Sequence, residues 1–400
     1  MKKAFKYELK VSQAVEQKLQ STLDTCRELY NAALEERRSA YKVAGISTNY
    51  TDQANQLPEI KQIRPEIAAV HSQVLQNVLK RVQFAFDGFF RRVKAGICAG
   101  YPRFKSKDRY DSFTYPQGGW RLEGDKLWLS KIGSMKVRLS RPVEGIIKTV
   151  TIKREGSHWF VIFACEVEPQ PLPATGEVKA IDVGLEYFIT DQRGEVREPP
   201  ECFRESEDKL AKAQRQMSRK KKGSGHWKQA REKVARIHRK IANQRRDFLH
   251  KLSTAIIREN DIIFFELLNI AGMVRNHHLA KSISDAAWGM FTGMLIYKAE
   301  EAGRVALNVN PNGTSQECSG CGERVPKGLS TRWHNCPRCG LSLSRDHNAA
   351  LNILARGMKL LPAVGQTVAA RGGSTVVEPV KRESALRCEE SLHSLLLTHS

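Results

Sequence analysis

The sequence predicts a multidomain α+β protein. Residues 11–95 carry apolar side chains at helical spacing, whereas residues 100–168 show the period-two alternation of β-strands. After a proline-rich segment at 168–176, strand patterns alternate with helical ones, which indicates an α/β sheet. A chain of 400 residues is long enough for two or three domains, each with its own core.

The N-terminal part is predicted to combine helices with a small β unit. Residues 1–10 are expected to form a strand, and a polar loop is expected at about 49–65, between two helices. The second helix carries an apolar stripe that we interpret as core packing rather than base stacking: Leu75, Val78, Leu79, Val82, Phe86, Phe89, Phe90 and Val93. The β unit at 100–168 has glycine-containing turns and is expected to close into a barrel.

A domain boundary is predicted at the proline-rich segment. The order expected beyond it is strand, hairpin, long helix, strand, helix, strand, cysteine cluster and helix, over residues 173–360. The tail at 361–400 is rich in Gly, Val and Ser without a sustained period, so we expect it to be mobile.

The charge balance points to a polyanionic partner. The chain has 65 Lys and Arg against 43 Asp and Glu, a formal net charge of +22. No run approaches 18 apolar residues, so no membrane span is expected. Charges stand where a signal peptide would be apolar, and the nine cysteines are an odd count. We therefore expect a reducing, cytoplasmic compartment, with the protein at the nucleoid when bound to DNA.

Two basic segments are candidates for nucleic-acid contact. Residues Lys209–Arg246 hold fifteen Lys or Arg and one acid, and such self-repulsion on a helical hairpin would be relieved by phosphates. Tyr101–Lys107 interleaves basic and aromatic residues; phosphate and base contact and a solvated loop are equally compatible with it. The candidate contacts are Arg103, Lys105, Lys107, Arg219, Lys220, Lys221, Lys222, Arg236, Arg239 and Lys240.

Three carboxylates are candidate catalytic residues. Asp182 and Glu266 each interrupt an apolar strand, and Asp346 stands near the start of a helix. A lone acid in a buried strand is costly unless it is paired or binds a cation. Taken together, the three acids predict a site for Mg²⁺ or Mn²⁺, where two ions about 4 Å apart would act on a phosphodiester. For each acid taken alone, an ordinary strand-end or cap residue is the preferred explanation.

Four clustered cysteines predict a structural zinc site. Cys318 and Cys321 form one C-x-x-C pair, and Cys336 and Cys339 form a second. Four thiolates at this spacing suit one tetrahedral Zn²⁺, and a glycine after each pair, Gly322 or Gly340, permits a tight turn. A redox pair is the alternative, which two matched pairs disfavour.

These motifs resemble the TnpB family, over roughly residues 1–360. The resemblance rests on Asp182 in Ile-Asp-Val-Gly-Leu, on Glu266 before Leu-Leu-Asn-Ile, and on the cysteine pairs leading into Arg345-Asp346-His347-Asn348-Ala349-Ala350. Supporting matches are Tyr101–Lys105, Ser282–Trp288 and Asn310–Gln316. Ser344 stands where the family often has an acid, and Leu267 where it often has Asp.

The resemblance implies a transposon-encoded, RNA-guided DNA endonuclease related to the type V CRISPR effectors. It implies a wedge-like β-barrel at 1–10 and 96–172, a helical recognition insert at 11–95, and an RNase H-like (RuvC) domain at 173–360 with a zinc-ribbon insert at 314–343. A transposon-derived guide RNA would pair with double-stranded DNA beside a short adjacent motif. A companion transposase encoded by the same element is a further expected partner.

Two other functions fit part of the pattern. An RNase H-fold transposase can use a similar acidic triad and basic surface, but it would join transposon ends to a target. A guided DNA-binding repressor would have lost catalysis, and the loss would first be visible at Asp182, Glu266 or Asp346, all of which are intact.

Overall fold

The chain forms two compact units, one comprising Met1–Val167 and the other beginning at Glu168. The computed structural model describes residues 1–200, 204–276, 280–328 and 331–370. The change of unit falls at the start of the proline-rich segment predicted to be a linker. None of the described helices combines the length and the apolar character needed to cross a membrane.

The first unit is built on an antiparallel seven-stranded sheet in the order β2-β6-β7-β1-β5-β4-β3. The central strand β1 (Lys2–Lys10) pairs with β7 along most of its length, and the predicted N-terminal strand is thereby confirmed. The other strands are β2 (Ser112–Tyr115), β3 (Trp120–Glu123), β4 (Lys126–Leu129), β5 (Gly133–Arg138), β6 (Ile146–Glu155) and β7 (His158–Glu166).

The expected closed barrel is wrong for the strands that the structure describes. Closure would need a ladder between the edge strands β2 and β3, but β2 pairs with β6 and β3 pairs with β4. Both edge strands have only four residues. The sheet is therefore open, although its alternating pattern still buries one face in a core that contains Phe5, Phe113 and Phe163.

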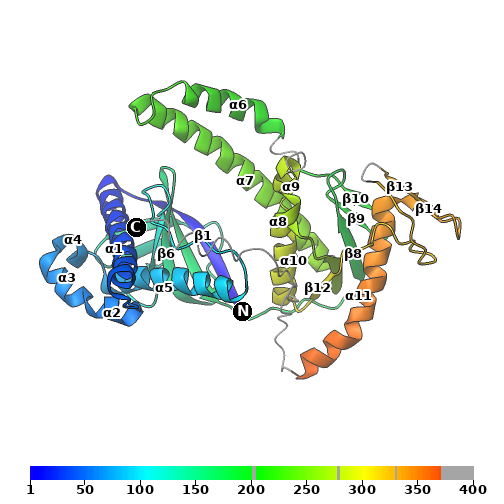
Figure 1. Cartoon of the computed structure of the whole chain (residues 1–400), viewed down its shortest axis with the longest axis horizontal. Coiled ribbons are helices and arrows are strands. Elements are labelled where there is room, and N and C mark those ends of the chain that lie inside the picture. The colour runs from blue at the N-terminus through cyan, green and yellow to red at the C-terminus, as the bar shows by residue number, and fades with distance from the viewer. Residues whose placement is uncertain (201–203, 277–279, 329–330, 371–400) are drawn as a thin grey trace. The chain divides into compact units, whose positions relative to one another are not determined.

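Helices fill the chain between β1 and β2 and pack on this core (Figure 1). Each of the two long helices buries an apolar stripe, with Leu19 and Leu75 fully buried. Their bounds, with those of the shorter helices, are α1 (Gln13–Ala44), α2 (Tyr50–Asn55), α3 (Leu57–Ile63), α4 (Pro65–Ala68) and α5 (Ser72–Lys94). The core packing predicted for the second stripe is confirmed from Leu75 to Phe86. It is wrong for Phe90 and Val93, which are 53% and 38% exposed because α5 continues past the last residue that it contributes to the core.

The polar loop expected at about 49–65 is instead mostly helical. Asn49 and Asp52 form a reciprocal capping box that starts α2, and a proline in the first turn starts α3. The helices are too short to show an apolar period, so composition alone suggested a loop. The buried residues Gln53 and Leu57 tie them to the core.

The second unit is built on a five-stranded sheet in the order β10-β9-β8-β11-β12. Its strands are β8 (Val178–Val183), β9 (Ile189–Asp191), β10 (Val196–Arg197), β11 (Ile262–Glu266) and β12 (Val305–Val309). β8, β11 and β12 are parallel, whereas β9 pairs antiparallel with β8. The order of strands, hairpin and helices predicted for this part is confirmed.

Helices cover both faces of this sheet (Figure 1). One face packs on the C-terminal half of α7 (Gly225–Glu259) and on α10 (Trp288–Ala302), and the opposite face packs on α11 (Arg345–Ala370). The remaining elements are α6 (Arg204–Ser218), α8 (Ile270–Met273), α9 (Ala280–Ala286) and the hairpin of β13 (Trp333–Asn335) and β14 (Ser342–Ser344).

The helix α11 extends beyond the boundary predicted for the C-terminal tail. Residues 361–370 continue the helix, so the first ten residues of the predicted tail, 361–400, are helical. The rest of that tail, 371–400, lies outside the described residues.

Candidate functional site

The parallel pairing of β8 and β11 brings two of the candidate carboxylates to neighbouring positions. Phe264 pairs with Ala180 and Phe265 pairs with Ile181, so the next step of the register sets Glu266 beside Asp182. Side chains two residues apart on a strand share a face. Asp182 and Glu266 therefore lie on the face of Ala180 and Phe264, which α11 covers.

The third carboxylate reaches this face from the start of α11. Ile353 of α11 packs against Ala180 and Phe264, and this packing directs the first turn of the helix toward the ends of β8 and β11. A carboxylate oxygen of Asp346 lies 3.8 Å from the point where a Cβ on Gly184 would stand, two residues after Asp182. Ser344 accepts a hydrogen bond of 3.3 Å from the His347 amide, so it caps this helix.

A close approach of helix and strand fixes this arrangement. Gly357 faces the ring of Phe264, and a Cβ at this position would overlap the ring carbons. Glycine lets α11 lie closer to β11 than any other residue would permit.

The three carboxylates repel one another in a poorly hydrated environment. Burial raises the pKa of Asp182 well above its usual value, and the charges of Glu266 and Asp346 raise it further. Burial also raises the pKa of Glu266, which a hydrogen bond from the Thr314 hydroxyl partly offsets. All three residues are partly buried. The Thr314 hydroxyl and Arg345 offset part of this negative charge, and a divalent cation would stabilise the remainder.

A further acid of the same sheet, Asp191, has the environment of a structural carboxylate. Asp191 on β9 is 1% exposed, pairs with Lys179 at 2.8 Å, and accepts hydrogen bonds from the amides of Arg193 and Glu195. Its charge is compensated within the protein. The charges that act most strongly on Asp182 are the carboxylates of Glu266 and Asp346, which raise its pKa. Arg345, which contacts Asp346 at 3.0 Å, lowers that pKa.

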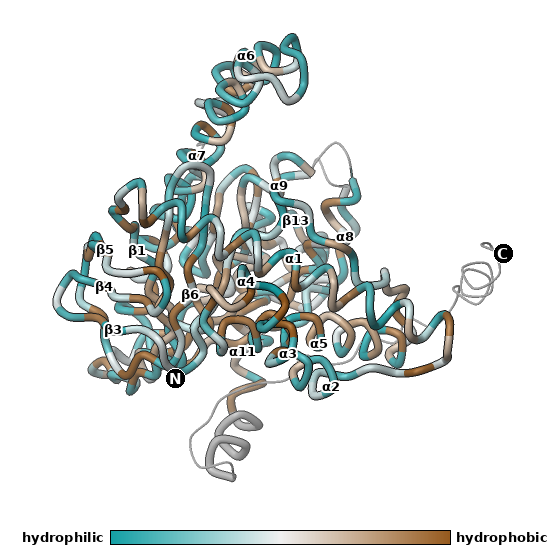
Figure 2. Tube along the Cα trace, turned by 90° about the vertical axis from the view of Figure 1, so that its left-hand side faces the viewer, coloured by the Kyte–Doolittle hydropathy of each residue, from teal (hydrophilic) through white to brown (hydrophobic). Residues whose placement is uncertain are grey.

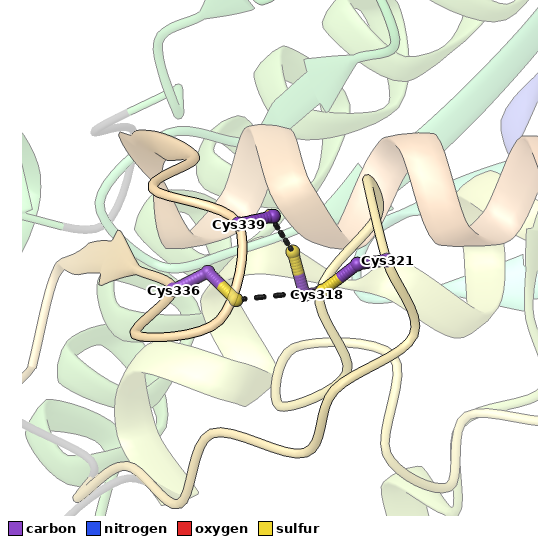
Figure 3. Close-up of side chains that lie close together, drawn as sticks. All are labelled: Cys318, Cys321, Cys336 and Cys339. Carbon is purple, nitrogen blue, oxygen red and sulfur yellow. Dashed lines mark hydrogen bonds between the residues drawn. The ribbon is translucent and has the colours of Figure 1, made fainter.

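The four cysteines converge at one point after β12, as Figure 3 shows. The sulfur atoms of Cys318 and Cys339 are 3.6 Å apart, as are those of Cys321 and Cys336, and all four lie within 4.8 Å of one another. Tetrahedral thiolates with metal–sulfur bonds of about 2.3 Å would be separated by roughly 3.8 Å. The geometry therefore fits one tetrahedrally bound metal ion.

Each cysteine pair forms the same tight turn. The amide of Gly322 donates to the carbonyl of Cys318, and that of Gly340 donates to the carbonyl of Cys336. Gly322 has φ of 78° and Gly340 has φ of 73°, in the left-handed region where glycine carries no steric cost. The predicted reason for these two glycines is confirmed.

A row of polar side chains on α11 connects the cysteine cluster to the carboxylates. Asn348 donates to the carbonyl of Glu317 at 2.7 Å and accepts from the amide of Ser319 at 2.9 Å. Asn352 donates to the carbonyls of Thr314 and Glu317 at 2.8 and 2.7 Å. The segment from Thr314 to Ser319 is thus attached to α11. The Thr314 hydroxyl donates to Glu266, and the other end of the segment contains Cys318 of the first cysteine pair.

Arg356 completes this row one turn further along the helix. Its guanidinium donates to the carbonyls of Asn310 and Asn312 and pairs with the carboxylate of Glu317 at 2.6 Å. Sequence reasoning missed Thr314, Asn348, Asn352 and Arg356 as parts of the site. The spacing of 348, 352 and 356 was the available signal, because residues four apart share one face of a helix.

The predicted basic hairpin is formed by α6 and α7. The two helices pack through Leu210, Ala213, Val234 and Ile241. Hydrophilic residues predominate along α6 (Figure 2). Arg219, Lys220, Lys221 and Lys222 lie exposed at the turn, Arg236 and Lys240 are exposed on α7, and Arg239 is partly buried. In the first unit, Arg103 and Lys107 are exposed and Lys105 is partly buried.

Comparisons with known proteins agree with this architecture. A family model described as "Probable transposase" (OrfB_IS605) matches residues 162–277, and "Cas12f1-like, TNB domain" matches residues 288–353. A "Helix-turn-helix domain" model matches residues 1–45, where the structure has one strand and one long helix. The solved Cas12f1–sgRNA–target DNA complex resembles the chain with a TM-score of 0.54 at 14% identity, covering 86% of this chain and 83% of that one. The predicted multidomain α+β, RuvC-like fold is thereby confirmed.

Two curated relatives match the chain over nearly its whole length. A "Putative RNA-guided DNA endonuclease" of Streptomyces pristinaespiralis is 37% identical over 90% of each chain. A protein of the same description from Escherichia coli K12 is 33% identical over 91% of this chain and 94% of the relative. TnpB-like proteins of Acanthamoeba polyphaga mimivirus are 27% identical over 56% of this chain. The chain belongs to the TnpB family.

Proposed function

We propose that the chain is an RNA-guided DNA endonuclease of an IS605-type transposon and that Asp182, Glu266 and Asp346 form its single cleavage site. The observation that carries the site assignment is the convergence of three partly buried carboxylates at the ends of β8 and β11 and the start of α11. The activity rests on relatives of that description at 37% and 33% identity.

The three carboxylates would hold two Mg²⁺ or Mn²⁺ ions. Such ions activate a water and stabilise the leaving oxygen of a phosphodiester. The chain itself supplies oxygen ligands from two strands and a helix start. The Thr314 hydroxyl, which donates to Glu266, fixes the direction in which that carboxylate points. Arg345, beside Asp346, offers a positive charge near the site.

One Zn²⁺ held by Cys318, Cys321, Cys336 and Cys339 would fix the segment that carries Thr314. Metal binding couples to local folding, and the Asn348 and Asn352 contacts join the segment to α11. In this proposal the cluster is structural, because protein thiolates fill all four ligand positions.

Substitution of Asp182 tests the cleavage site. Asp182→Ala should slow cleavage of guide-matched DNA by roughly 100-fold or more, since metal ions supply several kcal/mol of stabilisation. Binding of RNA and DNA should persist. The matched control is Asp247→Ala, at an exposed carboxylate of α7 that pairs with Lys251. Cleavage by Asp182→Ala at the control's rate in the same Mg²⁺ would exclude this assignment.

The partners are proposed to be a transposon-derived guide RNA and double-stranded target DNA, in the cytoplasm and at the nucleoid, with a transposase of the same element mobilising the transposon. The protein should be purified from cells that carry the native flanking DNA, and its bound nucleic acid should be sequenced. A guide-bearing RNA supports the proposal. Joining of transposon ends without RNA would support a transposase, and guided binding without any cleavage would support a repressor.

The basic hairpin is proposed to contact phosphates of the guide or of the guide–target duplex. Neutralising its turn should reduce the slope of log affinity against log salt by about 0.7 to 0.9 for each phosphate that is no longer neutralised, with equal effect on all guide sequences. The four substitutions are at Arg219, Lys220, Lys221 and Lys222. A control with the same change of charge neutralises four residues that pair with acids: Arg121, Lys136, Arg138 and Lys148. An equal slope for the two variants would contradict phosphate contact and would mean that the hairpin is a solvated segment that keeps the protein soluble.

A further inference from the structure

The C-terminal end of α5 and the loop that follows it form a groove in the first unit. Its volume is about 400 Å³. This is near the lower end of the roughly 300–1,000 Å³ of small-molecule sites, room for one ring system rather than for a helix. The lining includes the aromatic residues Phe84, Tyr101 and Phe104 and the basic residues Arg92, Arg103, Lys105 and Arg109.

The aromatic side chains of this groove are exposed to solvent. Phe84 is 65% exposed, and Tyr101 and Phe104 are each 44% exposed. Scattered apolar residues on a surface need no explanation, but three aromatic rings around one hollow leave a contiguous patch without a cover.

The charge of the groove selects the kind of ligand. Four of its lining residues are basic, and among the residues that the structure describes no acid lines it. Aromatic rings with arginines also occur at protein interfaces, but four cations without an acid favour a polyanion. Aromatic faces interleaved with cations match nucleic acid whose bases are unpaired, because a duplex hides the base faces.

The groove is held in shape before any ligand binds. Asn31 clamps the backbone of Lys105 on both sides, accepting from its amide at 2.8 Å and donating to its carbonyl at 3.0 Å. The Tyr101 ring meets those of Phe86 and Phe89 edge-on, with centroids 5.5 Å apart in each case. A preformed site loses less conformational entropy on binding, so even one stacked base would contribute measurable affinity.

We propose that this groove binds single-stranded nucleic acid, with an unpaired base packed on Phe84 and Phe104 and its flanking phosphates held by Arg92 and Arg103. The proposal rests on the proposed function for its ligand class and goes beyond it, because it places a base-contacting site away from the carboxylates. Its test measures binding alone, without added Mg²⁺, so it does not depend on cleavage.

The test compares three proteins in binding to fluorescent 15-residue oligonucleotides of uridine and of deoxythymidine. The double variant Phe84→Ala with Phe104→Ala should bind more weakly by roughly 5- to 150-fold for each base that no longer stacks. The control is Trp128→Ala, a residue of β4 in the same unit that is 43% exposed and does not line the groove. The control should retain wild-type affinity, and melting temperatures of all three proteins verify folding.

A second measurement locates the binding site. Ultraviolet crosslinking of an oligonucleotide that carries 4-thiouridine should yield adducts in the peptide spanning Phe84 or Phe104, and these should vanish in the double variant. Tighter binding of the uridine strand assigns the groove to RNA, tighter binding of the deoxythymidine strand assigns it to DNA, and equal binding shows contact through base and phosphate alone. Wild-type affinity of the double variant, or an equal weakening in Trp128→Ala, overturns the proposal.

Discussion

Replacing Asn348 with alanine should loosen the cysteine cluster without unfolding the sheet. Asn348 is fully buried, and it satisfies the amide of Ser319 and the carbonyl of Glu317. The carbonyl keeps its second donor, Asn352, at 2.7 Å. The substitution therefore leaves one orphaned group, the Ser319 amide, next to the first cysteine.

The expected free-energy cost of Asn348→Ala follows from this one unpaired amide. A partly buried donor left without an acceptor costs about 1–3 kcal/mol. Since 1.36 kcal/mol is a factor of ten, local opening of the segment should become roughly 5 to 150 times more frequent. The same opening exposes thiolates to chelators, so release of the bound metal should accelerate by a similar factor.

Hydrogen exchange followed by mass spectrometry measures this directly. The peptide that contains Ser319 should exchange faster in Asn348→Ala, whereas peptides of β8 and β11 should not change. Met358→Ala is the control, because Met358 lies on the same helix and is 48% exposed. Unchanged exchange at Ser319, or equal acceleration in the control, would refute the role given to Asn348.

Three further perturbations are expected to have distinct outcomes. Metal analysis should find about one zinc per chain, and Cys336→Ser should lose that zinc and lower the melting temperature; a zinc-free protein with unchanged melting would contradict this. Gly357→Ala should destabilise the second unit by about 1–3 kcal/mol in denaturant titration, because its methyl group meets the Phe264 ring. Burial lowers the pKa of Lys298 to about 8, so the unfolded chain binds the extra proton between that value and 10.5. The contribution of Lys298 to the free energy of unfolding should therefore rise with pH between 8 and 10.5. The difference in melting temperature between wild type and Lys298→Met should change over this pH range, and a constant difference would contradict the prediction.

The sequence was sufficient for elements that carry their own periodicity. The strands of Asp182 and Glu266 are apolar runs broken by one acid, so their type and their buried setting were readable without coordinates. Their register was not readable, because it depends on which residues of β8 and β11 face each other. The site roles of these residues and of the four cysteines stay predictions, whereas the fold and the family are confirmed.

Other features depend on partners distant in the chain. In the sequence, Asn348 and Asn352 look like polar residues on the solvent-facing side of a helix. Only the fold shows that they bind the backbone of residues 314–319. The short helices between residues 49 and 68 have too few turns to show a period, and their stability comes from caps and from burial of single residues. The failure of the first sheet to close is likewise a property of its edges, which no local pattern encodes.

The helix α7 belongs to two hydrophobic cores at once. Val234 and Ile241 pack on α6, whereas Leu249, Ile256 and Ile257 pack on the sheet. An unbroken helix turns by about 100° per residue, so these two halves share one rotational phase. Deleting a single residue between them would rotate the basic hairpin by about 100° around the helix axis, whereas deleting seven would return it to within about 20° of its original orientation. Natural or engineered changes in the length of α7 are therefore expected in steps of seven, with the hairpin turn as the place where other lengths can be absorbed.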